Sequence, residues 1–222
     1  MHSSFKQLSL VENKVNQIVR EKQLKINPKI IVVTKTFPLS KILTLLENGH
    51  MHYGENKVQE AEEKWTDVKS KHKDLQIHMV GKLQKNKVKK AVRFFDYIHS
   101  LDNRELASKI SKCEKELGKK IKLFIQINIA EEKQKNGIFL NELSDFYKYC
   151  TNELSLNIIG LMCLPPNDSN PEKYFKLLKE NADKFNLKDL SMGMSSDYEQ
   201  ATLCGSTFLR LGTAILGNRN IT

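Results

Sequence analysis

Short apolar runs of strand length recur along this chain, and each is followed by a segment with helical periodicity. Parallel strands cannot be joined by a tight turn and need a crossover connection, which is usually a helix. Repeated strand–helix units therefore predict a parallel sheet with helices packed against it. The strand-like runs fall at residues 30–34, 52–54, 75–80, 97–99, 121–129, 157–162, 190–192 and 207–211.

Eight such units predict an α/β fold of the TIM (β/α)8 barrel type. An open doubly wound sheet is the alternative, and periodicity alone does not exclude it. The near-equal spacing of the strands favours closure, and no glycine-rich GxGxxG follows any of them. We expect a single barrel domain over residues 1–222, with an extra helix before the first strand and no residues left for a second domain.

Several connecting segments carry helix signals of their own. Residues 195–197 read Ser-Ser-Asp, whose side chains suit the N-cap of the helix between the last two strands. The other helices are expected at residues 40–48, from 57 onward, at 82–93, 103–118, 141–150 and 171–184.

Positive charge is in excess, since Lys and Arg outnumber Asp and Glu by 36 to 26 and give a net charge of +10. Such a charge attracts phosphorylated ligands, nucleic acid or anionic surfaces without choosing among them. The densest basic stretch is 82–93, where Lys82, Lys85, Lys89 and Arg93 share one face at helical spacing. An apolar face opposite them favours a solvated helix exterior, and no aromatic residues interleave to stack on bases. Nucleic acid therefore remains a disfavoured alternative.

The apolar runs, the cysteines and the histidines limit where the protein is expected to occur and which ligands it is expected to bind. No apolar run approaches the roughly 18 residues of a membrane span, and the N-terminus lacks the apolar region of a signal peptide. The four cysteines are scattered, so we expect reduced thiols in a cytoplasmic protein with no membrane partner. His50 and His52 have the spacing of one strand face, but without a third ligand nearby we expect no metal site.

In a parallel barrel, functional residues lie at the carboxyl ends of the strands. Lys35 directly follows the apolar run IIVVT. Burying an unpaired ammonium there would be costly, so the amine is expected to be neutral, paired or chemically modified. A Schiff base to an aldehyde meets this requirement. A lysine that extends to solvent is the alternative that this segment leaves open.

The next strand ends offer hydrogen-bonding side chains. Asn56 follows the second strand, where it suits either a ligand contact or a helix N-cap, and both remain open. Gln126 and Asn128 alternate onto one face of the fifth strand. Two polar residues that point into a barrel need partners, which can be each other, water or a ligand.

The last two strand ends are rich in small residues. The loops after strands seven and eight commonly form phosphate sites in this fold, which makes Ser195, Gly212 and Thr213 candidates, with helix capping as the alternative. Arg210 lies within the last strand, where a buried guanidinium needs an acceptor or an ion pair. Together with Lys35, such a phosphate cradle suits an aldehyde-bearing phosphate ester.

These segments also resemble, in order, the motif series of the pyridoxal phosphate homeostasis protein family over residues 30–217. That resemblance implies an alanine-racemase-like barrel with pyridoxal 5'-phosphate on Lys35 and with Arg210 facing the pyridine nitrogen. It places Ser195, Gly212 and Thr213 around the phosphate, and Asn56 and Met162 close to the ring. The segments that carry the resemblance are VVTKTFP, YGENKVQE, HMVGKLQKNK, IQINI, GLMCLPP, LSMGMSSDYEQA and FLRLGTAILG.

The resemblance implies a non-catalytic binder that buffers pyridoxal phosphate and delivers it to apoenzymes. A racemase needs acid and base groups on both faces of its carbanion, and Lys35 serves only one of them. An arginine at the pyridine nitrogen also leaves that nitrogen unprotonated, which weakens the ring as an electron sink. A weak racemase or lyase is the alternative, and a nucleic-acid or anionic-surface binder that uses residues 82–93 is the second. The expected state is a monomer.

Overall fold

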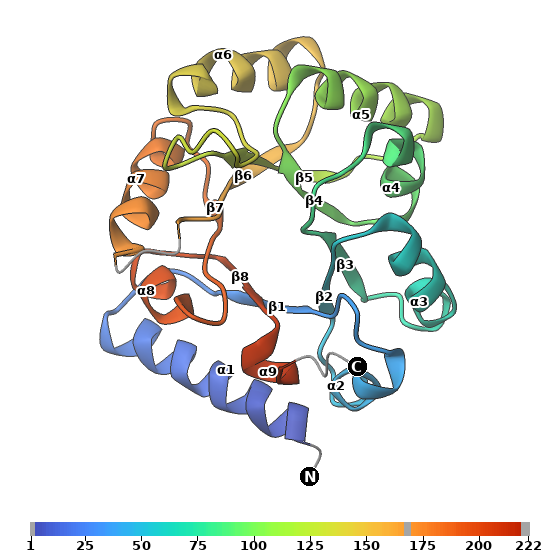
Figure 1. Cartoon of the computed structure of the whole chain (residues 1–222), viewed down its shortest axis with the longest axis vertical. Helices are drawn as coiled ribbons and strands as arrows, with labels where there is room; N and C mark the ends of the chain where they lie inside the picture. The colour runs from blue at the N-terminus through green and yellow to red at the C-terminus, as the bar shows by residue number, and fades with distance from the viewer. Residues whose placement is uncertain (1–2, 167–169, 219–222) are drawn as a thin grey trace.

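The structure is a computed structural model that describes residues 3–166 and 170–218. Eight parallel strands follow one another around a closed barrel in chain order, and β8 pairs with β1 (Figure 1). The TIM-barrel prediction is therefore confirmed, and the open sheet is excluded. The strands are β1 (Lys29–Val33), β2 (His52–Glu55), β3 (Gln76–Met79), β4 (Tyr97–Leu101), β5 (Lys122–Ile127), β6 (Ile158–Cys163), β7 (Asp189–Ser191) and β8 (Phe208–Leu211).

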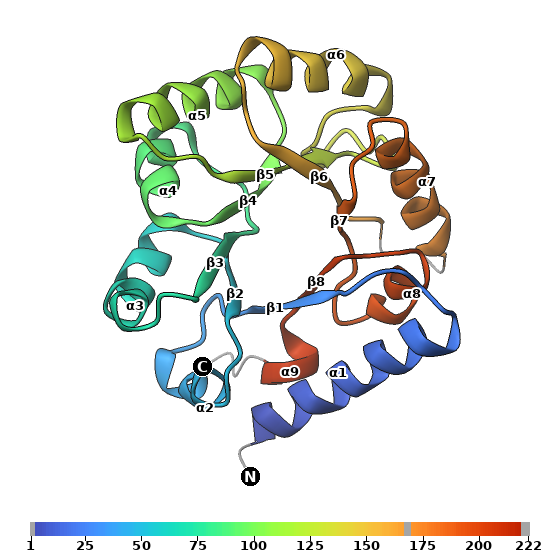
Figure 2. The same cartoon turned by 180° about the vertical axis from the view of Figure 1, so that it is seen from behind.

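Helices surround the barrel, as the views from the two sides show (Figures 1 and 2). Each helix from α2 to α9 follows the strand whose number is one lower, so α2 follows β1 and α9 follows β8. The strand–helix alternation read from the sequence is therefore the alternation of the fold. The helices are α1 (Ser3–Glu21), α2 (Leu43–Glu47), α3 (Val58–Lys71), α4 (Val88–Phe94), α5 (Arg104–Leu117), α6 (Leu143–Lys148), α7 (Glu172–Asp183), α8 (Tyr198–Leu203) and α9 (Thr213–Leu216).

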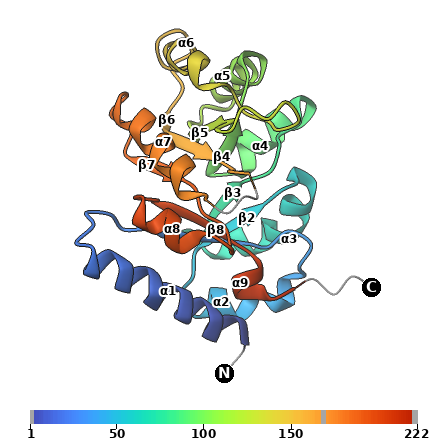
Figure 3. The ribbon, with the colours of Figure 1, turned by 60° about the vertical axis from the view of Figure 1, so that its left-hand side comes forward.

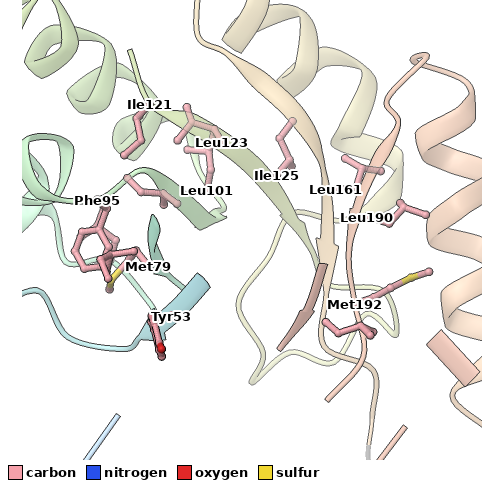
Figure 4. Packing of buried hydrophobic residues seen from close by; sticks show 14 of the residues in the cluster. Tyr53, Met79, Phe95, Leu101, Ile121, Leu123, Ile125, Leu161, Leu190 and Met192 are labelled. Atoms are coloured by element: carbon pink, nitrogen blue, oxygen red, sulfur yellow. The ribbon is translucent and has the colours of Figure 1, made fainter. Parts of the chain in front are cut away.

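The main hydrophobic core lies between the outer faces of the strands and the helices. Figure 4 shows part of it, with Met79, Leu101 and Leu161 among the side chains that the strands contribute. Strand residues alternate between this layer and the barrel interior because successive side chains point to opposite faces of a sheet. Helices close the layer by burying an apolar stripe, as α5 does with Leu106 and Ile110.

The two ends of α5 show which residues start and stop a helix in this fold. The side-chain oxygen of Asn103 accepts a hydrogen bond from the backbone N–H of Leu106 at 2.9 Å, which caps the first turn. Gly118 follows the last turn with φ at +61°, in the left-handed region that glycine adopts without a steric cost. The observed bounds match the expected helix at 103–118 within a residue at each end.

The extra helix expected before the first strand is α1. It runs along the outside of the barrel beside α8 and α9 (Figure 3). Leu8, Val11, Val15 and Ile18 are buried on one side of it, at helical spacing. This helix therefore covers α8 and α9, the helices that follow β7 and β8.

Some helices are shorter or less regular than expected. The segment 40–48 begins as a 3-10 turn, Leu39–Lys41, before α2. The segment 141–150 likewise begins with a 3-10 turn, and α6 continues into the π-helical turn Tyr149–Glu153. The capping role expected for residues 195–197 at α8 was wrong, because Asp197 occupies the N-cap position without a side-chain cap and its carboxylate accepts the Met194 N–H at 2.6 Å.

The basic stretch 82–93 forms a 3-10 turn, Lys85–Lys87, and then α4, with Val88 and Val92 buried as expected. Its charged side chains face acidic neighbours. Lys85 pairs with Glu105, and Lys89 pairs with Glu116 at 2.9 Å. These exposed pairs contribute little stability, but they make this face mixed in charge, which lends no support to the nucleic-acid alternative.

The findings on membrane spans and metal ligands concern residues 3–166 and 170–218. No helix there is long and apolar enough to cross a membrane. No group of three or more potential metal ligands is found in those ranges either. His50 and His52 lie at the amino-terminal end of β2, away from the strand ends that carry Lys35 and Arg210. The four cysteines are free thiols and buried.

The barrel interior contains histidines where such barrels usually carry aliphatic side chains. His78 and His99 are fully buried, and His52 is partly exposed at the end of the barrel where the strands begin. Burial lowers the pKa of His50 and of His52 to about 4, and lowers the pKa of His78 and of His99 well below 6.5. The folded protein therefore holds these rings neutral.

We expect stability to fall in mild acid. Unfolded histidines take up protons below about pH 6.5, whereas the buried rings do not until about pH 4 or lower. The unfolded state is therefore favoured as pH falls through this window, and the full stability is present only above it. Urea unfolding measured from neutral pH down to about pH 4.5 tests this expectation.

One variant separates the histidine contribution from that of the carboxylates. His52→Gln is expected to lessen the pH dependence of the free energy of unfolding. Equal slopes in the native protein and in His52→Gln would contradict the assignment.

Candidate functional site

A pocket opens at the carboxyl ends of the strands, with a cavity volume of about 560 Å³. Almost every strand–helix connection contributes to its wall, as expected for the functional face of a parallel barrel. The polar residues that line it are Lys35, Asn56, Lys82, Gln126, Asn136, Ser195, Ser196, Arg210 and Thr213.

Six of the seven residues predicted for the site line this one pocket. They are Lys35, Asn56, Ser195, Arg210, Gly212 and Thr213. The seventh, Met162 on β6, does not line it. Its side chain is fully buried inside the barrel in a cluster with Phe124 and Phe208, because the alternation of β6 directs it into the interior.

Lys35 follows β1 and is half-buried on the pocket wall. Its two neighbours are held by hydrogen bonds. The Thr34 hydroxyl donates to Glu55 Oε1 at 2.6 Å, and the Thr36 N–H donates to Glu60 Oε1 at 2.5 Å. Thr36 has φ at +67°, a left-handed conformation that costs a non-glycine residue about 1–3 kcal/mol. Such strain persists only where the surroundings fix the backbone, as they do on both sides of Lys35.

Glu55 is a fully buried carboxylate on the outer side of β2. Besides the Thr34 hydroxyl, its Oε1 accepts hydrogen bonds from Lys64 Nζ at 2.8 Å and from Trp65 Nε1 at 2.9 Å. Lys64 Nζ also donates to the Thr34 carbonyl oxygen at 2.8 Å. One buried ion pair thus connects α3, β2 and the segment that carries Lys35.

Sequence reasoning did not find this pair. The signal was a carboxylate at the last position of β2, on the face where the strand otherwise packs against helices. Its partner is nine residues away on a helix, so the pairing depends on how α3 folds back over the strand.

Arg210 is buried in β8 and lines the pocket. Its Nη1 donates to Ser191 Oγ at 2.6 Å, and its Nη2 donates to the Cys163 carbonyl oxygen at 2.9 Å. Its acceptors are therefore neutral oxygens, and no ion pair of Arg210 occurs within the described ranges. Burial lowers its pKa to about 10, so it remains charged at neutral pH. These two contacts use two of the five N–H donors of a guanidinium.

The loops after β7 and β8 meet at Ser195. Its hydroxyl oxygen accepts the backbone N–H of Gly212 at 3.3 Å and of Ala214 at 3.1 Å. Ser195 therefore joins the loop after β7 to the first residues of the short helix α9, whose N-cap position is Gly212. The same arrangement gathers backbone donors beside the pocket, next to Thr213.

Asn56 does not cap α3, so that alternative was wrong. The N-cap position belongs to Lys57 and has no side-chain hydrogen bond, whereas Asn56 lies on the pocket wall. Gly81 allows the two loops to approach closely. A Cβ on Gly81 would lie 2.7 Å from the Asn56 carbonyl oxygen, so only glycine fits there.

Gln126 and Asn128 have separate partners. Gln126 faces the pocket, and its Nε2 donates to the Asn136 carbonyl oxygen at 3.1 Å. Asn128 instead holds its own loop, since its Nδ2 donates to the Glu132 carbonyl oxygen at 2.8 Å. Lys82 Nζ donates to Asn136 Oδ1 at 2.8 Å on the pocket wall. No local sequence signal indicated Asn136.

The chain matches known families over nearly its whole length. Residues 8–220 match the family described as "Alanine racemase, N-terminal domain". The "Pyridoxal phosphate homeostasis protein" of Haemophilus influenzae is 34% identical over 224 residues, which cover 96% of this chain and 94% of that protein. The protein of the same name from Aquifex aeolicus is 36% identical over 200 residues, covering 86% and 87%.

Solved structures agree with this relationship. Two structures of PipY from Synechococcus elongatus, each 31% identical, cover 91% of this chain and 100% of their own. The TM-score is 0.81 for the structure without PLP and 0.79 for the one with PLP bound. An alanine racemase from Clostridium difficile is 15% identical with a TM-score of 0.71, covers 98% of this chain and 57% of its own, and supports the fold alone. This chain belongs to the pyridoxal phosphate homeostasis proteins, within the alanine racemase N-terminal domain family.

Proposed function

We propose that this chain binds pyridoxal 5'-phosphate in the pocket of a single barrel domain, residues 1–222, and buffers and delivers the cofactor. The observation that carries the proposal is that Lys35, Arg210 and the Ser195 loop open into one pocket. The structure of the Synechococcus relative with PLP bound supports it.

The donor set fits this cofactor. An aldehyde needs a primary amine, a phosphate needs N–H and hydroxyl donors, and a pyridine nitrogen needs one hydrogen-bond donor. Lys35 offers the amine, the hydroxyls of Ser195, Ser196 and Thr213 line the pocket as donors for a phosphate, and Arg210 offers a donor for the ring nitrogen. The volume of about 560 Å³ also lies within the range of small-molecule sites, roughly 300–1,000 Å³.

Lys35 Nζ would hold the cofactor as a Schiff base, in which a C=N bond replaces the aldehyde C=O and the oxygen leaves as water. Thr34 and Thr36 fix the backbone from which this amine extends. Arg210 stays charged and donates only, so the ring nitrogen it faces would remain unprotonated. That arrangement favours reversible attachment over carbanion chemistry.

The pocket wall offers little for two-sided proton transfer. Among the described residues that line it, no carboxylate, imidazole, phenol or thiol occurs, and the second amine, Lys82, is hydrogen-bonded to Asn136. Because a racemase needs a second acid–base group, this supports a carrier. The racemase or lyase alternative requires amino-acid turnover that Lys35→Ala abolishes.

We expect the purified protein, loaded with pyridoxal phosphate, to show the visible absorbance of a protonated imine. Lys35→Ala is expected to lose that band. Lys82→Ala is the matched control, since it removes another amine from the same wall, and it is expected to keep the band. An unchanged spectrum in Lys35→Ala, or loss of the band only in Lys82→Ala, would place the attachment elsewhere.

We also expect the loaded protein to reactivate an apoenzyme that uses pyridoxal phosphate. The assay compares reactivation with the rate at which cofactor leaves the protein into a trap. Reactivation faster than passive release indicates delivery on contact. Reactivation at or below that rate would refute delivery and leave buffering alone.

The buried pair beneath Lys35 provides a third expectation. Lys64→Met leaves the Glu55 carboxylate buried without its cation, which is expected to cost about 3–5 kcal/mol in the free energy of unfolding. Because the Thr34 segment loses a contact, cofactor affinity is expected to fall roughly tenfold. Both quantities are measurable, by urea unfolding and by spectroscopic titration.

Lys69→Met on the same helix is the matched control. It breaks the partly exposed pair with Asp96, away from the pocket, and is expected to leave cofactor affinity unchanged. Similar affinities in Lys64→Met and in the native protein would show that the buried pair does not position Lys35.

A further inference from the structure

Three histidines form a hydrogen-bonded chain through the barrel interior. His52 Nδ1 lies 3.0 Å from His78 Nε2, and His78 Nδ1 lies 3.0 Å from His99 Nε2. His99 Nδ1 then lies 2.7 Å from Ser191 Oγ, which also accepts from Arg210 Nη1 at 2.6 Å. The chain starts at the barrel end where the strands begin and finishes at the guanidinium on the pocket wall.

The path crosses the barrel from one wall to the other. The histidines come from β2, β3 and β4, whereas Ser191 and Arg210 come from β7 and β8. The bond between His99 and Ser191 therefore spans the interior. Ring stacking fixes the imidazole planes, since His78 stacks on Tyr97 and His99 on Phe124, each with centroids 4.3 Å apart. The rings are held in orientation as well as in place.

Arg210 determines the direction in which protons are donated along the chain. A guanidinium can only donate, so Ser191 Oγ accepts from it. The Ser191 hydroxyl then has one proton to give, and the acceptor found for it among the described residues is His99 Nδ1. With Nδ1 unprotonated, a neutral His99 carries its proton on Nε2 and donates to His78 Nδ1. The same step repeats from His78 Nε2 to His52 Nδ1.

Burial keeps the three rings neutral, and surrounding positive charges add to its effect. Arg210 faces His99, and Lys29 and Lys122 face His52 and His78 at the other end. Among the described residues, Asp96 is the acidic group that acts on His52, and His50 adds to the effect of the lysines. The lysines themselves lie over aromatic rings, Lys29 on Phe208 and Lys122 on Tyr97.

We propose that Ser191, His99, His78 and His52 are positioning residues that fix the orientation of the Arg210 guanidinium in the pocket. Arg210 has two anchors, Ser191 Oγ and the Cys163 carbonyl, and two contacts define the plane of a guanidinium where one does not. The histidine chain holds Ser191 as an acceptor, because its own proton is committed to His99. The remaining N–H donors of Arg210 are thereby directed into the pocket.

The consequence for the cofactor rests on the proposed function. If pyridoxal phosphate occupies the pocket, the chain sets the hydrogen bond that its ring nitrogen receives. The orientation of Arg210 in the unloaded protein does not depend on that assumption. The tests therefore begin with the unloaded protein.

The first test uses the native protein alone, so it does not depend on whether any variant folds. Long-range ¹H–¹⁵N spectra of the histidine rings in the unloaded native protein distinguish the two neutral tautomers and the charged ring. We expect His52, His78 and His99 to be neutral with the proton on Nε2 at neutral pH. A proton on Nδ1 in any of the three, or a charged ring, would overturn the chain as described.

The second test compares two buried serines of the barrel. Ser191→Ala removes the acceptor of Arg210, whereas Ser100→Ala removes a hydroxyl for which no hydrogen-bond partner is found among the described residues. We expect restricted rotation of the Arg210 guanidinium, seen as separate Nη signals, in the native protein and in Ser100→Ala. The signals are expected to merge in Ser191→Ala. Retention of separate signals in Ser191→Ala would overturn the positioning role.

The third test uses pyridoxal phosphate itself. Losing one hydrogen bond to a charged group corresponds to a roughly tenfold weaker affinity, which we expect for Ser191→Ala and not for Ser100→Ala. The shift of the pyridine ¹⁵N signal is also expected to change only in Ser191→Ala. Equal affinity and equal shifts in the two variants would refute the effect on the cofactor. If the native protein bound no pyridoxal phosphate, the proposed function would fail, while the first two tests would still decide the orientation of Arg210.

Discussion

The pairing of β1 with β8 is the constraint on which the rest of this molecule depends. It closes the barrel, and its register sets Ile31 beside Arg210 and Val32 beside Leu211. Lys35 follows one of these strands, and Gly212 follows the other. Two segments at opposite ends of the sequence thus form adjacent parts of one pocket wall. The helix α1 covers this seam from outside by packing on α8 and α9.

Closure also creates an interior in which polar side chains must satisfy one another. Neutral imidazoles and a guanidinium are costly to bury without partners. The barrel meets this requirement with one connected path from His52 to Arg210, while a cluster that includes Ile31, Phe124 and Met162 fills much of the remaining space. The same path supplies one of the two anchors of the guanidinium, Ser191 Oγ, and the Cys163 carbonyl oxygen supplies the other. The hydrogen bonds that provide partners for these buried polar groups therefore also help to orient Arg210 in the pocket.

The sequence predicted the barrel because each strand end is marked locally, by an apolar run followed by a helical pattern. Lys35, Asn56 and Arg210 could be predicted for the same reason, since a parallel barrel gathers its strand ends at one face. Met162 was placed near the ring by resemblance; it lies in the barrel interior and does not line the pocket, and its place near the ring stays a prediction. Contacts between side chains that are distant in the sequence could not be predicted from the sequence. Glu55 with Lys64, and His99 with Ser191, depend on helix packing and on the width of the barrel.

The central claim is that Lys35 holds pyridoxal phosphate covalently. The most direct measurement is borohydride reduction of the loaded native protein, followed by digestion and mass spectrometry of the peptides. The account predicts a phosphopyridoxyl group on the peptide that contains Lys35, with Lys82 unmodified. Modification of Lys82 instead, or of no pocket lysine after complete reduction, would contradict it.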